Sequence, residues 1–167
     1  MEFREITFSE ISAEKRELLK EAFKVMKNAY NIYSGYYVGA AVLTKNGAVY
    51  HGVNLENASF GVGLCAEIAA IQSAFTAGDP FISMIAIVTG SEEHPGDEVA
   101  FPCGRCRQVL SECSTISKSD IEVICSNRDM TKIVITSISK LLPVAFSSSD
   151  LKKDNAIENY IQRIQNE

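Results

Sequence analysis

The sequence lacks any apolar run that could cross a membrane. A helix that spans a bilayer needs about 20 consecutive apolar residues, and no stretch of these 167 residues approaches that length. Residues 1–11, MEFREITFSEI, are acidic and mixed, without the basic and apolar regions of a signal peptide. We therefore expect a cytoplasmic protein that does not associate with membranes.

An excess of positive charge is missing as well. Lys and Arg total 16 whereas Asp and Glu total 21, which gives a formal net charge of -5. A protein of this sign is repelled by the phosphate backbone of nucleic acids. We therefore expect no nucleic-acid partner, and chemistry on a small molecule is favoured instead.

The number of cysteines is odd, which argues against a framework of disulfides. The chain has five cysteines, and in a reducing compartment these are free for metal binding or for burial in the core. Cys113 and Cys125 stand alone among mixed or β-rich residues, so we interpret them as small core side chains. Three cysteines remain as candidates for chemistry.

Hydrophobic periodicity predicts alternating helices and strands. Helices are expected over residues 13–29, over 64–77 and from 103 onward. Strands are expected over residues 38–44, 48–54, 82–88, 121–126 and 132–137, with an Asn-Gly turn between the first two. A leading hairpin followed by alternating helix and strand predicts an α/β fold, a three-layer α-β-α sandwich around a five-stranded mixed sheet.

The length fits a single domain over residues 1–167. A chain of 167 residues can bury a substantial core without disulfides or structural metals. Near its end, Ile157, Tyr160 and Ile161 recur at helical spacing in a polar segment. We expect residues 150–167 to form either a C-terminal helical extension or a frayed tail.

A Cys-x-x-Cys pair follows Pro102 at the start of an expected helix. Two residues between Cys103 and Cys106 let both sulfurs reach one metal ion, and the helix dipole favours the thiolates that zinc requires. Taken alone, the pair could equally be a redox dithiol or half of a structural zinc site.

Cys65, at the start of an earlier helix, supplies a third thiolate. Three protein ligands leave one position of a tetrahedral zinc ion open, which is typical of a catalytic site. His51 and His94 are the candidates for a fourth ligand, but we interpret both as incidental. Glu67, two positions after Cys65, could then act on a water molecule as a general acid and base.

These motifs resemble a known family. Cys-Ala-Glu from residue 65 and Pro-Cys-Gly-Arg-Cys-Arg-Gln from residue 102 are similar to the signatures of zinc-dependent cytidine deaminases. Three further stretches, YSGYYVGAAV, NLENAS and LLPVAF, narrow the resemblance to the small homotetrameric cytidine deaminases. The resemblance implies a Zn²⁺ cofactor and a homotetramer with sites shared between subunits. It also implies hydrolytic deamination of cytidine or deoxycytidine to uridine or deoxyuridine plus ammonia.

The resemblance assigns roles to individual residues. It implies that the three cysteines bind zinc, that Glu67 transfers protons, that Asn54 and Glu56 hydrogen-bond the ribose, and that the backbone of Ala66 contacts the pyrimidine. Judged from the residues alone, Asn54 could instead belong to a turn.

Two aromatic residues complete the implied substrate site. Tyr36 falls where the family usually has a phenylalanine against the base, so a phenol could change which substituents fit. Phe146 matches an aromatic residue that a neighbouring subunit donates, although a core aromatic is the simpler interpretation of the residue alone.

The chain departs from the family after the glutamate, where Ile68 replaces an arginine. Three thiolates and one Zn²⁺ sum to a net charge of -1, which would weaken the acidification of water by zinc. Arg105, between the two clustered cysteines, is the expected source of the missing positive charge.

Other functions remain open at this stage. PCGRCRQVL also resembles blasticidin S deaminases, so blasticidin S or a modified-cytosine nucleoside is an alternative substrate, although Glu56 argues against blasticidin S. A polynucleotide-editing deaminase would share the zinc core, but the acidic charge opposes it. A non-catalytic zinc-binding module would keep the cysteines without needing Glu67.

Overall fold

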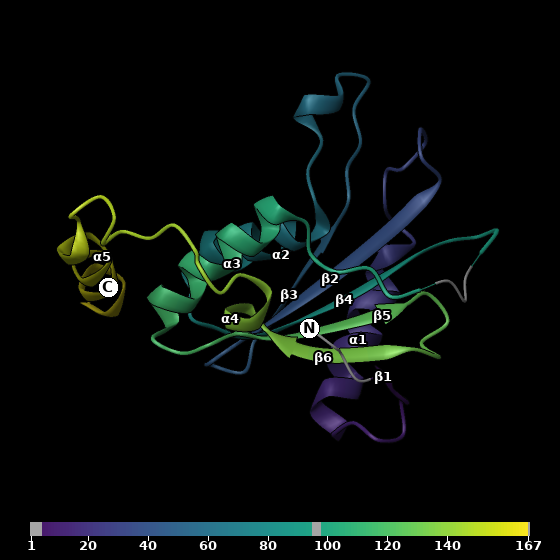
Figure 1. Ribbon diagram of the computed structural model, residues 1–167, viewed down its shortest axis with the longest axis horizontal. Coiled ribbons are helices and arrows are strands. Elements are labelled where there is room, and N and C mark those ends of the chain that lie inside the picture. The colour runs from purple at the N-terminus through teal and green to yellow at the C-terminus, as the bar shows by residue number, and fades with distance from the viewer. Residues whose placement is uncertain (1–4, 95–97, 167) are drawn as a thin grey trace.

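The computed structural model describes residues 5–94 and 98–166 (Figure 1). The helices are α1 (Ala13–Met26), α2 (Ala66–Thr76), α3 (Gly104–Ser117), α4 (Ile138–Leu141) and α5 (Asp154–Asn166), with a short 3-10 helix at Phe60–Val62. The strands are β1 (Glu5–Ile6), β2 (Tyr36–Thr44), β3 (Val49–Val53), β4 (Ile82–Ser91), β5 (Glu122–Asn127) and β6 (Ile133–Ser137). Within these described residues, every helix is too short or too polar to span a bilayer.

One mixed sheet organises the fold. Its strand order is β1-β6-β5-β4-β2-β3, and β4 and β5 run parallel while the other neighbouring strands run antiparallel. The sequence predicted five strands, whereas the structure has six, because Glu5 and Ile6 pair with Val134 and Ile133 at the edge of β6. A strand of two residues is too short to show the alternation from which strands are predicted.

Helices cover both faces of the sheet, which confirms the predicted three-layer arrangement. α1 lies on one face, where Leu19 shares an apolar cluster with Val88 of β4. α2 and α3 lie on the other face, where Ala70 and Leu110 share a cluster with Ile87. Ile87 and Val88 are adjacent, and successive strand residues point to opposite faces, so β4 contributes to both cores.

Two glycines let these helices pack closely on the sheet. A Cβ atom at Gly52 in β3 would lie 2.2 Å from the Ala66 carbonyl oxygen and 2.3 Å from the Ala70 nitrogen of α2. On the opposite face, a Cβ atom at Gly39 in β2 would lie 2.1 Å from the Ala22 carbonyl oxygen of α1. A side chain at either position would push its helix away from the sheet.

The C-terminal helix α5 lies against the ends of α2 and α3. Tyr160 stacks on Phe75 with the ring centroids 6.3 Å apart. Lys118 Nζ lies 3.1 Å from the Glu158 carboxylate. Residues 150–167, expected as a possible helical extension, thus contain a helix that contacts the last turns of α2 and α3. The starts of these two helices lie away from it.

Candidate active site

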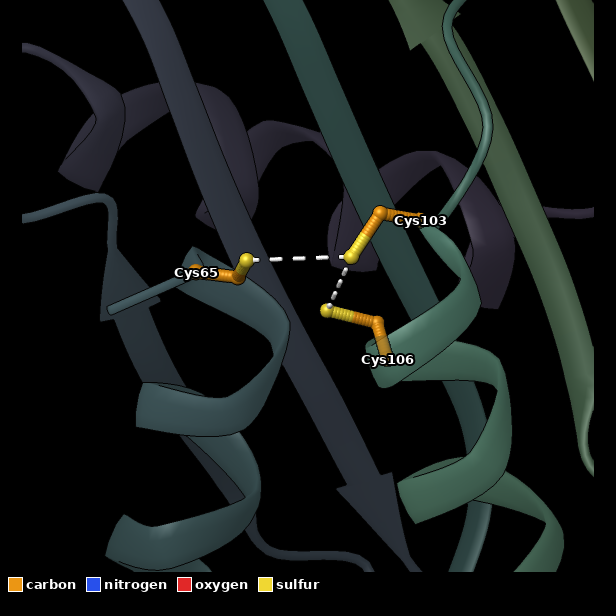
Figure 2. A group of neighbouring side chains, drawn as sticks. All are labelled: Cys65, Cys103 and Cys106. Atoms are coloured by element: carbon orange, nitrogen blue, oxygen red, sulfur yellow. Dashed lines mark hydrogen bonds between the residues drawn. The ribbon is translucent and has the colours of Figure 1, made fainter. Parts of the chain in front are cut away.

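Three cysteines from the starts of α2 and α3 lie together (Figure 2). Cys65 and Cys103 are the N-cap residues of the two helices, and Cys106 lies in the first turn of α3. The Cys65 and Cys103 sulfurs are 3.9 Å apart, those of Cys103 and Cys106 are 3.6 Å apart, and all three lie within 4.8 Å of one another. These separations fit a tetrahedral zinc ion, because zinc–sulfur bonds of about 2.3 Å place two sulfurs roughly 3.8 Å apart.

The surroundings of Cys65 favour its thiolate form. A hydrogen bond from Cys106 is the main cause that lowers the pKa of the Cys65 thiol to about 6, and Cys103 and the positive charge of Arg105 add to it. The same hydrogen bond, together with burial, raises the pKa of Cys106. The positive ends of two helices meet here as well, and this potential suits thiolate ligands.

Glu67 lies in the same pocket. Its side chain is only 6% exposed, and burial raises the pKa of its carboxyl above the ordinary value. Glu67 lines a cavity of about 620 Å³ together with Cys65 and Cys103. A raised pKa makes the protonated form of a carboxyl easier to reach, which suits a group that must both take up and release a proton.

Asn54 and Ala66 line this cavity too. The Asn54 side-chain oxygen accepts a hydrogen bond from the Val38 N–H at 2.9 Å, and its amide nitrogen donates to the Tyr36 carbonyl at 2.9 Å. Asn54 therefore fixes the start of β2 beside the cavity. Ala66 is the first residue of α2, where helix geometry leaves the backbone N–H without an intrahelical acceptor.

Glu56 is also in the cavity wall, where it is half-buried. Its carboxylate accepts hydrogen bonds from the Tyr33 N–H at 2.9 Å, from the Ser34 N–H at 3.2 Å and from the Ser34 hydroxyl. The hydroxyl contact is the main cause that lowers the pKa of Glu56. Glu56 is therefore an anion that also holds the turn before β2, a second role that its sequence position does not reveal.

The two aromatic candidates differ in placement. Tyr36 lines the cavity and is 37% exposed. Phe146 is 59% exposed and is not among the residues that line the cavity of its own chain. Gln108 of α3 donates a hydrogen bond to the Phe146 carbonyl at 2.7 Å, so the segment that carries this ring is fixed to the helix with the clustered cysteines.

Arg105 lies exposed in the first turn of α3, where its charge reaches Cys65. Ile68, at the position of the missing arginine, is half-buried in α2. Among the described residues, the cysteine cluster that could hold a metal ion contains neither histidine. His51 Nε2 instead lies 2.8 Å from the Glu21 carboxylate. The backbone N–H of His94 donates a hydrogen bond to the Ser91 hydroxyl.

The remaining cysteines lie in the core, as the sequence predicted. Cys113 is 2% exposed and Cys125 is fully buried. Burial raises the pKa of the Cys113 thiol to about 12 and raises that of Cys125 as well. Both thiols are therefore protonated and unreactive, which separates them from the three clustered cysteines.

Several cavity residues escaped the sequence analysis. Ile87 and Thr89 of β4 form part of the cavity floor, and Phe60, Ala100 and Phe101 contribute to its walls. The alternation of β4 does place Ile87 and Thr89 on one face, but the sequence does not reveal which face meets the cysteines. Phe60 begins a 3-10 helix of three residues, and Ala100 and Phe101 lie in an irregular segment, so periodicity gives no signal for any of them.

Comparisons with known proteins place the chain in a family. Residues 12–121 match the family described as "Cytidine and deoxycytidylate deaminase zinc-binding region". A cytidine deaminase from Halalkalibacterium halodurans is 38% identical over 138 residues, which are 83% of this chain and 98% of that protein.

Solved structures agree. The crystal structure of cytidine deaminase from Burkholderia pseudomallei has 37% sequence identity and a TM-score of 0.70, and the match covers 81% of this chain and 100% of that one. The enzyme from Mycobacterium tuberculosis has 33% identity and a TM-score of 0.65, over 81% of this chain and 99% of that one. The matched family region contains all three clustered cysteines, and the chain therefore belongs to the cytidine deaminase family.

Proposed function

We propose that this protein catalyses the hydrolytic deamination of cytidine and deoxycytidine to uridine and deoxyuridine, with release of ammonia. The observation that carries this proposal is the buried Glu67 carboxyl in one cavity with the cysteine cluster. Membership of the cytidine deaminase family and the names of its similar members support the same substrates.

We propose that Cys65, Cys103 and Cys106 hold a catalytic zinc ion. Their sulfur separations and the lowered pKa of Cys65 fit this ion. When bound, zinc supplies a Lewis acid that makes water a nucleophile at neutral pH. The exposed guanidinium of Arg105 offsets part of the negative charge that three thiolates bring.

Glu67 carries the protons in this scheme. Its carboxylate takes the two protons of the water that adds to C4 of the pyrimidine, one after the other, and delivers the first to N3 and the second to the departing amino group. Burial raises its pKa, so the protonated form that must persist between these two transfers is favoured.

The remaining candidates bind the nucleoside. The Glu56 carboxylate accepts a hydrogen bond from a ribose hydroxyl, and Asn54 hydrogen-bonds the ribose as well. The backbone N–H of Ala66, which has no acceptor within its own helix, binds a polar atom of the base. Tyr36 packs against the pyrimidine ring. All four residues line the cavity that contains Glu67, which supports this assignment.

We further propose that the protein assembles as a homotetramer in which Phe146 completes the site of a neighbouring copy. Large apolar side chains are exposed on segments around the cavity, including Tyr30, Ile32, Leu55, Phe60 and Phe146. Surfaces of this kind on one molecule are typical of protein–protein contacts. Light scattering on the purified protein tests the number of copies.

The other candidate functions fit the site less well. Blasticidin S has no ribose for Glu56 to bind, and a zinc-binding module without activity gives no reason to bury the Glu67 carboxyl. A deaminase of polynucleotides would need an excess of positive charge, whereas this chain has a net charge of -5.

Turnover measured by mass spectrometry tests the proposal. Zinc-loaded protein should deaminate cytidine and deoxycytidine faster than cytosine or blasticidin S.

The Glu67→Gln variant should keep its zinc and its fold but lose about 10²-fold or more in kcat, because an amide cannot transfer the proton. The Cys106→Ala variant should lose zinc, because two thiolates hold it weakly. Faster turnover of cytosine or blasticidin S than of both nucleosides would contradict the proposed substrates.

A further inference from the structure

A buried hydroxyl group in the cavity has no partner. Thr89 lies near the end of β4, is 5% exposed and lines the cavity with Glu67 and Cys103. Within the described part of the chain, no hydrogen-bond partner lies within reach of its Oγ1 atom. Buried hydroxyls are nearly always paired with protein, ligand or water, because an unpaired one costs free energy. We therefore expect a molecule bound in the cavity to hydrogen-bond this hydroxyl.

The neighbours of Thr89 in the sheet cannot supply that partner. Val38 of β2 and Asn127 of β5 flank Thr89 in the register, so their side chains share its face. Val38 is apolar, and Ile87, the next residue of β4 on this face, is apolar too. Two neighbours on this face are polar: Ser91 of β4, whose hydroxyl accepts a hydrogen bond from the backbone N–H of His94 at 3.0 Å, and Asn127.

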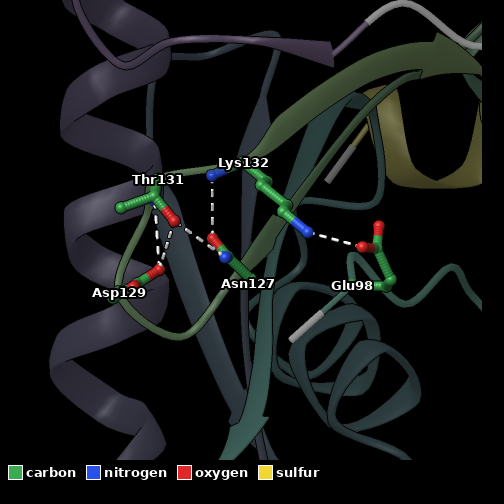
Figure 3. A network of polar contacts seen from close by, with 5 residues as sticks. All are labelled: Glu98, Asn127, Asp129, Thr131 and Lys132. Carbon is green, nitrogen blue, oxygen red and sulfur yellow. Dashed lines mark hydrogen bonds and ion pairs between the residues drawn. The ribbon is translucent and has the colours of Figure 1, made fainter. Parts of the chain in front are cut away.

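The amide of Asn127 is already engaged, as Figure 3 shows. Its oxygen accepts from the Lys132 N–H at 3.0 Å, and its nitrogen donates to the Thr131 hydroxyl at 3.0 Å. Lys132 also forms an ion pair with Glu98. These contacts connect β5 to the segment that continues into the cavity wall at Ala100 and Phe101. The polar side chains beside Thr89 thus hydrogen-bond one another and the segment that forms this wall, rather than Thr89.

The proposed reaction changes the hydrogen-bonding character of its substrate at one place. At C4 the amino group of cytidine, which donates, becomes the carbonyl oxygen of uridine, which accepts. A backbone carbonyl or amide near this position would match only one of the two. A threonine hydroxyl rotates and can accept from the first and donate to the second. Thr89 is a hydroxyl of this kind in the cavity where Glu67 must reach C4.

We propose that the Thr89 hydroxyl hydrogen-bonds the exocyclic 4-substituent of the pyrimidine, in both substrate and product. This inference rests on the proposed function. It makes Thr89 a specificity-determining residue for the atom that is exchanged in the reaction, and it gives the unpaired hydroxyl its partner.

A pair of variants separates the hydroxyl from the packing. Thr89→Val keeps the shape and removes the hydroxyl, whereas Thr89→Ser keeps the hydroxyl and removes the methyl group. We expect Thr89→Val to lose about tenfold in kcat/KM for cytidine, the effect of one lost hydrogen bond. Thr89→Ser should stay within about threefold of wild type. Zinc content should be unchanged in both, and the thermal unfolding temperature of Thr89→Val should equal or exceed that of wild type, because its burial leaves no unpaired group.

Binding measured by calorimetry locates the contact. In a Glu67→Gln background, chosen to suppress turnover, adding Thr89→Val should weaken cytidine and uridine by about tenfold each. The riboside of pyrimidin-2-one, which lacks a 4-substituent, should change by less than about twofold, since no hydrogen bond is lost. An equal loss for all three nucleosides would refute the contact at the 4-position.

The outcomes also distinguish this inference from the proposed function. If wild type deaminates cytidine and Thr89→Val does so equally well, the inference is wrong and the function stands. If Thr89→Val and Thr89→Ser are impaired alike, Thr89 acts through packing, and the inference is again wrong. If wild type does not deaminate cytidine at all, both fail together.

Discussion

Replacing Gly52 with alanine should displace one half of the candidate site from the other. The added Cβ atom would lie 2.2 Å from the Ala66 carbonyl oxygen and 2.3 Å from the Ala70 nitrogen, whereas non-bonded heavy atoms prefer about 3.5 Å. α2 must therefore move away from β3 by roughly 1 Å. Cys65 and Glu67 would move with α2, while the two cysteines of α3 would not.

The expected effects can be given magnitudes. Overpacking of this kind costs about 1–3 kcal/mol of stability, and a misplacement of about 1 Å in an active site costs on the order of 10²-fold in rate. We therefore expect the free energy of unfolding of Gly52→Ala to fall by about 2 kcal/mol, which urea unfolding followed by circular dichroism measures. At a temperature where the variant is folded, kcat/KM for cytidine should fall on the order of 10²-fold, and zinc content should fall as well.

Gly39→Ala is the matched control. Its Cβ atom would lie 2.1 Å from the Ala22 carbonyl oxygen of α1, on the opposite face of the sheet. No residue of α1 lines the cavity, so this variant should lose a similar amount of stability and keep most of its activity per folded molecule. If Gly52→Ala and Gly39→Ala were equally active and equally loaded with zinc, the reasoning would be refuted.

Three further changes test individual residues. Arg105→Ala should release zinc to a chelator about tenfold faster, and adding Ile68→Arg should partly restore retention; unchanged release would show that the charge is balanced elsewhere. Glu56→Ala should lose about 2 kcal/mol or more in kcat/KM for either nucleoside, with little effect on free cytosine. Glu56→Gln, which keeps an acceptor for the turn before β2, is its control, and equal losses for cytosine and nucleosides would exclude a ribose contact. Phe146→Ala should lower kcat/KM in mixed assemblies only when the neighbouring copy carries the change, and independence from the neighbour would refute a shared site.

The cysteine cluster could be predicted because each of its cysteines lies at a helix start. Cys103 and Cys106 are close in sequence, so their spacing alone brings the two sulfurs together, and Cys65 caps the other helix on the same face of the sheet. Local motifs therefore contained most of the information about the candidate metal site. The number of strands was less predictable, because β1 exists only through its pairing with β6.

The contacts of the residues that line the cavity were harder to predict from the sequence. Glu56 was predicted as a residue that binds ligand, but its hydrogen bonds to Tyr33 and Ser34 join segments 22 or 23 residues apart. The unpaired hydroxyl of Thr89 depends on what Val38 and Asn127 offer across two neighbouring strands. Such features arise from tertiary packing, and no local pattern records them.

The shortness of β1 affects how the sheet ends. β6, with the sequence IVITS, is uncharged and rich in β-branched residues, and a strand of this kind at an open edge can pair with another copy and aggregate. Within the described residues, β1 covers Ile133 and Val134, and it presents two residues and the charge of Glu5 to any incoming chain. At these two positions a second molecule cannot pair directly with β6. Residues 5 and 6 therefore cover part of this edge against pairing with another copy, a role that is independent of catalysis.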